Sequence, residues 1–310
     1  MRSVDKGIKL KDNLLDLGVF RDSLMFLQQY RLGCIFMQDT DQKEKERQKK
    51  VNELIKKFYS KSNDLPYSNL NKQKKYAGWV SDFHLKYRQN NEKIFLDLKN
   101  KNDLFLLFIL AIAWSRPGYW ENAPYLISYI KYSKNDYKEY WINRTHIENE
   151  IENSKKNSRS ITDYVYGIIP RKKINFRKDI FNSINVLANK WDEINSKLKE
   201  CSENQNYIEF MQYLHNINGL GCGNKGIFIK IPLILRELRC QNIFSNIPGD
   251  ICCVIDDRVS DACKKIGIEI SARQESINYL EKSSKNIYNY FGDLYDIPLF
   301  AYNDIYNNQE

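Results

Sequence analysis

Glycine, proline and histidine are scarce in this chain of 310 residues, which contains 13, 7 and 3 of them. Because helix-breaking residues are few and Lys, Asn, Ile and Leu recur at helical spacing, the sequence predicts a mostly α-helical fold. The histidines are His84, His146 and His215, and none of them stands in the Cys/His spacing of a zinc site. We therefore expect neither a bound metal nor a cofactor.

Cysteine pairs of the C-x-x-C type are also missing. The seven cysteines are an odd number spread over a long chain, and no cysteine follows Cys263. This distribution does not fit a disulfide framework or the four closely spaced cysteines of an iron–sulfur cluster. We expect the thiols to be reduced, as in an intracellular protein.

Long hydrophobic runs are absent as well. The longest apolar stretch, residues 104–114, is shorter than the roughly 18 residues of a membrane helix, so it predicts a buried helix capped by Asn102 or Asp103. The first fifteen residues contain no apolar core before charges resume, which is unlike a secretory signal. We expect a cytoplasmic protein without a membrane partner.

Basic side chains outnumber acidic ones by 48 to 39, and the resulting net charge of +9 favours a polyanionic partner such as nucleic acid. Residues 41–75 are strongly charged and predict a helical insertion. A second basic cluster contains Arg171, Lys172 and Lys173. Each of these two regions is either a solvated surface or a contact with phosphates, and the sequence leaves both possibilities open.

A glycine-rich segment lies between two helical patterns and predicts a helix-hairpin-helix over residues 216–238. Gly219, Gly221 and Gly223 alternate in it, and Lys225 follows. Glycine permits positive φ and close backbone approach, which leaves main-chain N–H groups able to bind a phosphate. A purely structural turn between helices uses the same residues. Because no strand precedes the segment and neither Ser nor Thr follows Lys225, dinucleotide-binding and P-loop sites are excluded.

An acidic residue marks the next informative segment, residues 247–267. Asp256 follows the apolar run of residues 251–255 and stands where a helix is expected to begin. A carboxylate there can cap the helix and interact favourably with its dipole. Capping is the ordinary structural role for such a residue.

Together the two segments resemble the helix-hairpin-helix DNA glycosylase superfamily, and most closely its archaeal-type 8-oxoguanine glycosylases. Lys225 and Asp256 lie 31 residues apart (256 − 225), and Arg258 and Val259 follow as in the family pattern. The resemblance implies a single unit over residues 1–310, in which two helical subdomains flank a DNA-binding cleft. It also implies that Lys225 is the nucleophile, that Asp256 is the activating carboxylate, and that an AP lyase step can follow base excision.

The resemblance extends to a pocket for a base flipped out of the duplex. Gln29 and Trp120 match family positions that read and line this pocket, and the aromatic Phe228 is a further candidate. Tyr302 and Tyr306 stand where the family has an aspartate and a tryptophan that contact the base, so the resemblance leaves open whether the excised base is an 8-oxoguanine-like lesion or another modified base. Arg258 is expected to contact DNA together with the hairpin.

The expected partner is therefore double-stranded DNA that contains a modified base, bound by a monomer. Repair of a lesion and removal of a hypermodified base from phage DNA both remain open. One alternative is a non-catalytic helix-hairpin-helix module that binds DNA. A second is a structural protein that binds no nucleic acid, for which the positive charge only promotes solubility.

Overall fold

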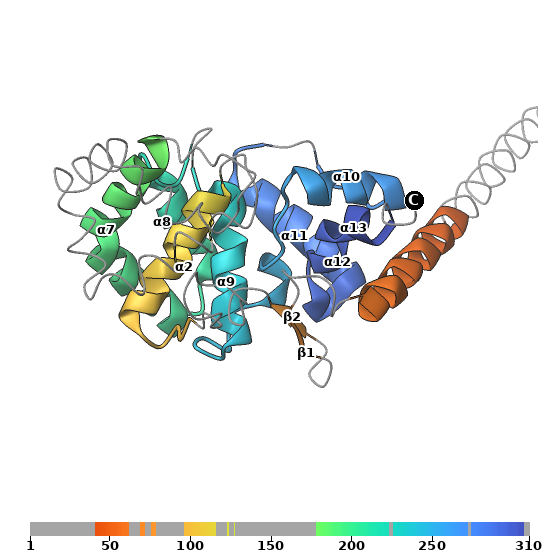
Figure 1. Cartoon of the computed structure of the whole chain (residues 1–310), viewed down its shortest axis with the longest axis horizontal. Coiled ribbons are helices and arrows are strands. Elements are labelled where there is room, and N and C mark those ends of the chain that lie inside the picture. Colours follow the sequence, from red (N-terminus) through yellow and green to blue (C-terminus); the bar gives the residue numbers. More distant parts are fainter. Residues whose placement is uncertain are drawn as a thin grey trace, which may run out of the picture. The chain divides into compact units, whose positions relative to one another are not determined.

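The computed structural model describes residues 41–61, 69–71, 76–78, 96–115, 123, 127, 178–222, 226–271 and 274–306. These residues are mostly α-helical, as the sequence predicts, with one short antiparallel hairpin of strands (Figure 1). The chain divides into two compact units, residues 1–52 and 53–310. In the described part of the chain, no helix is long and apolar enough to cross a membrane.

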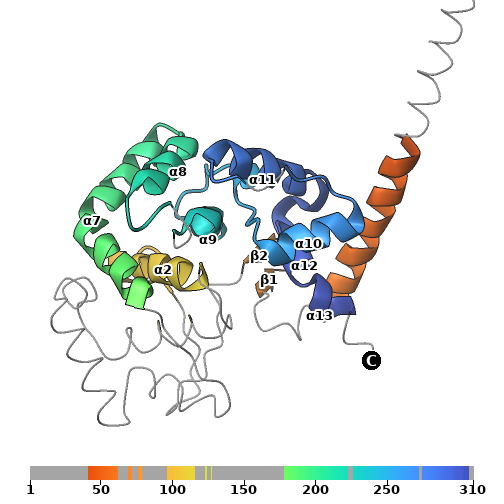
Figure 2. The ribbon, with the colours of Figure 1, turned by 90° about the horizontal axis from the view of Figure 1, so that it is seen from above.

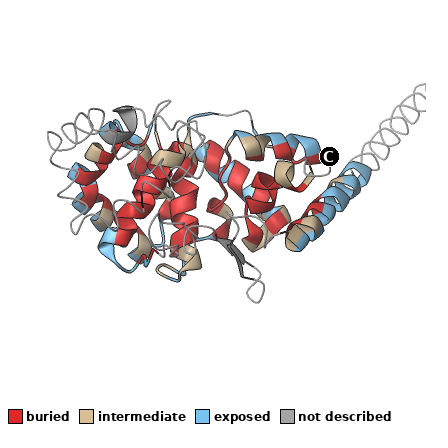
Figure 3. Ribbon diagram, in the orientation of Figure 1, coloured by how far each residue is buried: buried red, intermediate tan, exposed pale blue. Residues whose placement is uncertain are grey.

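Helix α2 (Lys101–Trp114) is a largely buried helix of the larger unit. Ten of its residues are buried, so the helix is apolar on every side rather than amphipathic (Figure 3). Its N-cap is Asn100, whose side chain accepts a hydrogen bond from the Asn102 amide, and not Asn102 or Asp103 as the sequence suggested. Asp103 is buried instead, and its carboxylate accepts a hydrogen bond from the amide of Asp97.

Helices α7 (Lys178–Glu203) and α8 (Tyr207–Asn216) extend the packing around α2, since α7 contacts α2 and α8 contacts α7 (Figure 2). Trp191 of α7 meets the rings of Phe105 and Phe108 edge-on at centroid distances of 5.0 and 5.3 Å. These apolar contacts support the glycine-rich segment, because that segment begins where α8 ends.

The remaining helices carry or support the acidic segment. In chain order they are the 3-10 turn η1 (Phe228–Lys230), α9 (Ile231–Cys240), the 3-10 turn η2 (Gly249–Ile251), α10 (Asp257–Ile266), α11 (Ile277–Phe291), the 3-10 turn η3 (Gly292–Leu294), α12 (Ile297–Phe300) and α13 (Tyr302–Tyr306). Helix α9 contacts α2, η1 and η2, while α11 packs against η2 and α8. Helix α10 contacts α12, which in turn contacts α13.

Within the charged region of residues 41–75, the described helix spans residues 41–61. Val51, Leu54 and Phe58 form its buried stripe, and most of the other side chains are exposed. Residues 69–71 belong instead to strand β1 (Asn69–Asn71), which pairs antiparallel with β2 (Tyr76–Gly78). The predicted continuous helical insertion is therefore wrong beyond residue 61 in the part described, because the Asn-rich segment there is paired as a strand.

A buried ion pair joins α9 to the start of α12. Nη1 of Arg236 donates to Oδ1 of Asp296 at 2.6 Å, and both side chains are almost fully buried. The same carboxylate oxygen accepts the Val254 amide at 2.8 Å. Burial raises the pKa of Asp296, while the Arg236 guanidinium and the Val254 amide act in the opposite direction. The pair therefore fixes the segment that leads into Asp256.

We predict that Asp296→Ala destabilises the protein by about 3 to 5 kcal/mol, because it leaves the buried Arg236 cation without its hydrogen-bonded partner. The measurement is urea-induced unfolding followed by circular dichroism. The matched control is Asp192→Ala, which removes an exposed ion pair of similar length, 2.8 Å, to Lys101. Equal losses in the two variants would contradict the structural role of the Arg236–Asp296 pair.

Candidate functional site

Lys230 and Asp256 form the principal buried pair of charged groups next to the glycine-rich segment. Nζ of Lys230 lies 2.7 Å from Oδ2 of Asp256, and the two side chains are 8% and 20% exposed. The lysine is thus nearly enclosed, whereas the carboxylate retains a small opening to solvent. A buried cation and anion at hydrogen-bonding distance mark a candidate active site, because such pairs of charged groups are common in active sites.

A 3-10 turn positions Lys230. Residues 228–230 form η1, and Lys230 is the N-cap residue of α9, without a side-chain capping bond of its own. Pro232 in the first turn of α9 suits a helix start, because its missing N–H would have no intrahelical partner there. The ammonium group therefore turns toward Asp256 from the point where α9 begins.

Asp256 is held by the helix that follows it. Its Oδ1 accepts the Val259 amide at 3.1 Å, which makes Asp256 the N-cap residue of α10. Burial alone would raise the pKa of this carboxyl, but the Lys230 ammonium, with its hydrogen bond, and the Val259 amide outweigh burial and hold the pKa below its ordinary value. Asp256 is therefore ionised at neutral pH, with one oxygen capping the helix and the other facing the lysine.

The segment before Asp256 is fixed from two sides. The Cys253 amide donates to Oγ of Ser284 on α11 at 2.9 Å, and the Val254 amide donates to Asp296. Residues 251–255 are all buried. Because successive main-chain groups are held, the Asp256 carboxylate has little freedom to leave Lys230.

Thiols near this segment are poor candidates for a nucleophile. Burial raises the pKa of Cys240 and of Cys263 to about 12, and it also raises the pKa of Cys252 and Cys253. Neutral thiols are weak nucleophiles. None of these four thiols is therefore a candidate nucleophile at neutral pH.

The glycine-rich segment forms a tight turn after α8. Gly219 has φ of +79°, and a Cβ on Gly221 would lie 1.9 Å from the carbonyl oxygen of Leu214. The turn closes where the Ile227 and Phe228 amides donate to the carbonyls of Leu220 and Gly221. Glycine is thus required at 219 and 221 for the turn itself, whether or not a phosphate binds there.

Gly226 completes this closure and was not singled out from the sequence. A Cβ on it would lie 2.2 Å from the carbonyl oxygen of Gly221. The helix after the turn, α9, begins at Ile231. The expected arrangement of helix, hairpin and helix thus takes the form of α8, a closed loop, η1 and α9.

Arg258 and the two C-terminal tyrosines lie in a different set of contacts. Nη2 of Arg258 binds Oδ2 of Asp304 at 3.1 Å, and its guanidinium lies 4.4 Å from the centre of the Phe300 ring. Tyr302 and Tyr306 stack on each other with centroids 4.6 Å apart. Arg258 therefore ties α10 to α12 and α13 in this structure.

Lysines lie over both tyrosine rings of that stack. Nζ of Lys57 is 4.0 Å from the centre of the Tyr306 ring, and Nζ of Lys265 is 5.1 Å from that of Tyr302. Phe228, a further pocket candidate, is buried and meets His215 edge-on. In the described contacts these three aromatic residues thus pack against protein groups.

Seven predicted site residues lie outside the described residues. They are Gln29, Trp120, Arg171, Lys172, Lys173, Gly223 and Lys225. Their roles stay predictions. Among the residues that are described, no group of three or more His, Cys, Asp or Glu side chains could hold a metal ion.

The sequence analysis missed Lys230. It is the only charged residue in the run of residues 227–235, and a lone cation in an apolar run indicates a buried anionic partner. That signal was available, but the partner 26 positions later was not identifiable from spacing alone.

Comparison of the chain with protein-family models, curated proteins and solved structures finds no match.

The lowered pKa of Asp256 predicts a specific pH dependence of stability. Because the folded pKa lies below the ordinary value of 3.8, the ionised carboxylate stabilises the fold above that pH, and this contribution disappears as pH falls through the folded pKa. Urea unfolding of the wild type and of Asp256→Asn should therefore differ most near neutral pH and converge in acid.

The matched control is Asp257→Asn, which removes an exposed carboxylate from the first turn of the same helix. It should lower stability less than Asp256→Asn at neutral pH. Curves for the wild type and Asp256→Asn that stayed parallel into acid would show that the charge on Asp256 does not stabilise the fold.

Proposed function

We propose that this protein is a DNA glycosylase that excises a modified base through a lysine and an aspartate. The observation that carries the proposal is the Lys230–Asp256 pair, 2.7 Å apart and largely buried, beside a glycine turn that requires close backbone approach. The resemblance of the glycine-rich and Asp256 segments to helix-hairpin-helix glycosylases supports the same chemistry. The net charge of +9 favours the polyanionic substrate.

Asp256 supplies the electrostatic part of this reaction. Breaking the bond between a base and C1′ of its sugar builds positive charge on the sugar ring, and a fixed carboxylate stabilises that charge. Asp256 suits this role because its lowered pKa keeps it ionised and its helix cap keeps it in place. Its partial exposure leaves one side open to a substrate.

A lysine supplies the nucleophile. In the resting protein Lys230 and Asp256 are an ion pair, so the ammonium must lose a proton before it can attack. The proton goes to the departing base as the C1′–N bond breaks, and the amine nitrogen forms a bond to C1′. The C1′–O4′ bond then breaks as a proton moves from the nitrogen to O4′, which opens the sugar ring and leaves a protonated Schiff base. Loss of a proton from C2′ expels the 3′ phosphate by β-elimination, and this nicks the strand.

Two lysines are candidates for this step. Lys225 matches the family position, whereas Lys230 is the lysine whose ammonium meets Asp256 in the structure. We favour Lys230, because a nucleophile must reach the same sugar carbon that the carboxylate stabilises. The substrate is double-stranded DNA with a modified base, either a lesion or a hypermodified base of foreign DNA.

A second candidate function is a DNA-binding module without catalysis. The observation that favours it is that Asp256 already has two structural partners, the Val259 amide and Lys230. Gly219 and Gly221 likewise serve the turn. In this alternative the same residues hold the fold together and present the protein to phosphates.

We predict that the purified protein releases a free base from DNA and that Asp256→Asn lowers the rate by about 100-fold or more, since fixed electrostatic stabilisation typically contributes this much. The measurement is mass spectrometry of bases released from plain, oxidised, alkylated, deaminated and hypermodified phage DNA. Asparagine preserves the shape of the helix cap, so DNA affinity should remain close to that of the wild type.

Borohydride trapping distinguishes the lysines, because it reduces a Schiff base to a stable bond between protein and DNA. Trapping should be lost in Lys230→Gln and retained in Lys225→Gln, with thermal melting and DNA binding as controls for folding. The reverse pattern assigns the nucleophile to Lys225. Base release without trapping excludes a covalent lysine, and DNA binding without release from any DNA favours the non-catalytic module.

A further inference from the structure

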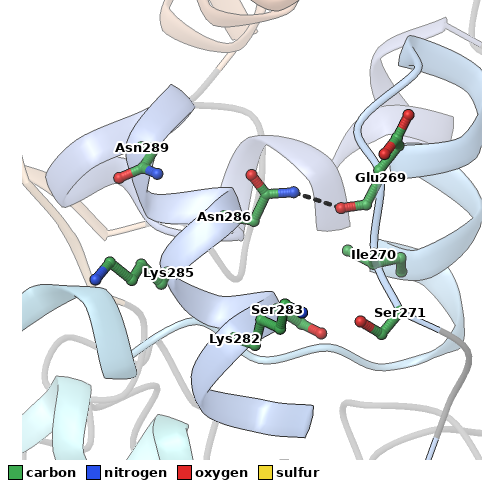
Figure 4. A pocket seen from close by; sticks show the side chains of 8 residues that line it. All are labelled: Glu269, Ile270, Ser271, Lys282, Ser283, Lys285, Asn286 and Asn289. Carbon is green, nitrogen blue, oxygen red and sulfur yellow. Dashed lines mark hydrogen bonds between the residues drawn. The ribbon is translucent and has the colours of Figure 1, made fainter.

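A polar pocket lies between α11 and the chain that follows α10. Its volume is about 480 Å³, within the range of small-molecule sites (Figure 4). The side chains that could bind a ligand there are Ser271, Lys282, Ser283, Lys285, Asn286 and Asn289. They are hydroxyl, ammonium and amide groups, all of which can donate hydrogen bonds.

Ser283 is the most informative of these residues. Its side chain is buried, with the residue 2% exposed, and its Oγ has no hydrogen-bond partner among the described residues. A buried hydroxyl without a partner costs about 1 to 3 kcal/mol. Because Ser283 lines the pocket, a ligand in the pocket could supply the missing hydrogen bond.

The neighbouring Ser284 differs from Ser283 because its hydroxyl has a hydrogen-bond partner. Its Oγ is also buried but accepts the Cys253 amide at 2.9 Å. The two consecutive hydroxyls thus face different surroundings, one the segment before Asp256 and the other the pocket. Ser283 is not needed for that main-chain contact and remains available to a ligand.

Two lysines of α11 also line this pocket. Lys282, Lys285, Asn286 and Asn289 follow the spacing i, i+3, i+4 and i+7, which places them along one side of α11. Both lysines are exposed, and neither forms an ion pair with a residue in the part of the chain that the structure describes. In Figure 4 the ammonium of Lys285 extends away from residues 269–271, at the edge of the pocket.

The opposite wall is held in place by a hydrogen bond from the side chain of Asn286 to the main chain. The Asn286 amide donates to the carbonyl oxygen of Glu269, so α11 and residues 269–271 are joined across the pocket. The Glu269 carboxylate is the one acidic group in the lining, and Figure 4 shows it directed away from Ser271 and Ser283. The carboxylate therefore does not face the two serine hydroxyls of the lining.

We propose that this pocket binds a phosphate group. A phosphate carries negative charge and several acceptor oxygens, which match two ammonium groups, two hydroxyls and the Asn289 amide. The phosphate belongs either to a free nucleotide or to the backbone of DNA. The proposal does not depend on base excision, since Lys230 and Asp256 are not part of this lining.

Titration calorimetry of the full chain tests the proposal with inorganic phosphate and deoxyadenosine monophosphate at constant ionic strength. Both should bind, and Ser283→Ala and Lys282→Gln/Lys285→Gln should each weaken binding by about tenfold, as expected for a hydrogen bond to a charged group. The matched control is Lys99→Gln/Lys199→Gln, which removes two exposed lysines elsewhere and should leave the affinity unchanged.

Binding to an unmodified 20-base-pair duplex, measured over a series of salt concentrations, separates the two sources of phosphate. If the pocket holds a backbone phosphate, the lysine variant should reduce the slope of log affinity against log salt by about 0.9 per lost contact relative to the control. An unchanged slope with weakened nucleotide binding assigns the pocket to a free ligand. The proposal is wrong if none of the three probes binds, or if the pocket variants behave as the control does. Because the duplex contains only normal bases, failure of base excision would not affect this result.

Discussion

The buried ion pair between Arg236 and Asp296 is the contact on which the candidate site depends. Asp296 binds the arginine of α9 and the Val254 amide with the same oxygen, so it links α9 to the chain two residues before Asp256. Lys230 lies at the start of that helix. A single buried carboxylate thereby sets the separation between the elements that carry the lysine and the aspartate.

The helical class and the main landmarks of the site could be predicted from sequence because they have local causes. Scarce glycine and proline together with helical periodicity indicate helices, and a carboxylate after an apolar run indicates the cap that Asp256 forms. The start of α2 was misplaced by two or three residues because Asn and Asp recur at residues 100, 102 and 103. Two contacts that the sequence does not show distinguish them, because the Asn102 amide donates to Asn100 and the Asp97 amide donates to Asp103.

The contacts that make the site could not be predicted, because they join residues far apart in the chain. Lys230 meets Asp256 across 26 positions, and Arg236 meets Asp296 across 60. The sequence analysis selected Lys225 as a site residue because it follows the glycines. It did not select Lys230, which lies within an apolar run. The stacked Tyr302 and Tyr306, with Lys57 and Lys265 over their rings, likewise depend on segments brought together by the fold.

The double use of Asp256 has an evolutionary consequence. Its carboxylate caps α10 and also neutralises a nearly enclosed lysine, so losing either member of the pair leaves the other charge without compensation in a region of low dielectric. Such a pair cannot drift one residue at a time without passing through a destabilised intermediate. In descendants of this sequence, Lys230 and Asp256 should therefore be inherited or replaced together, even in a lineage that no longer needs their chemistry.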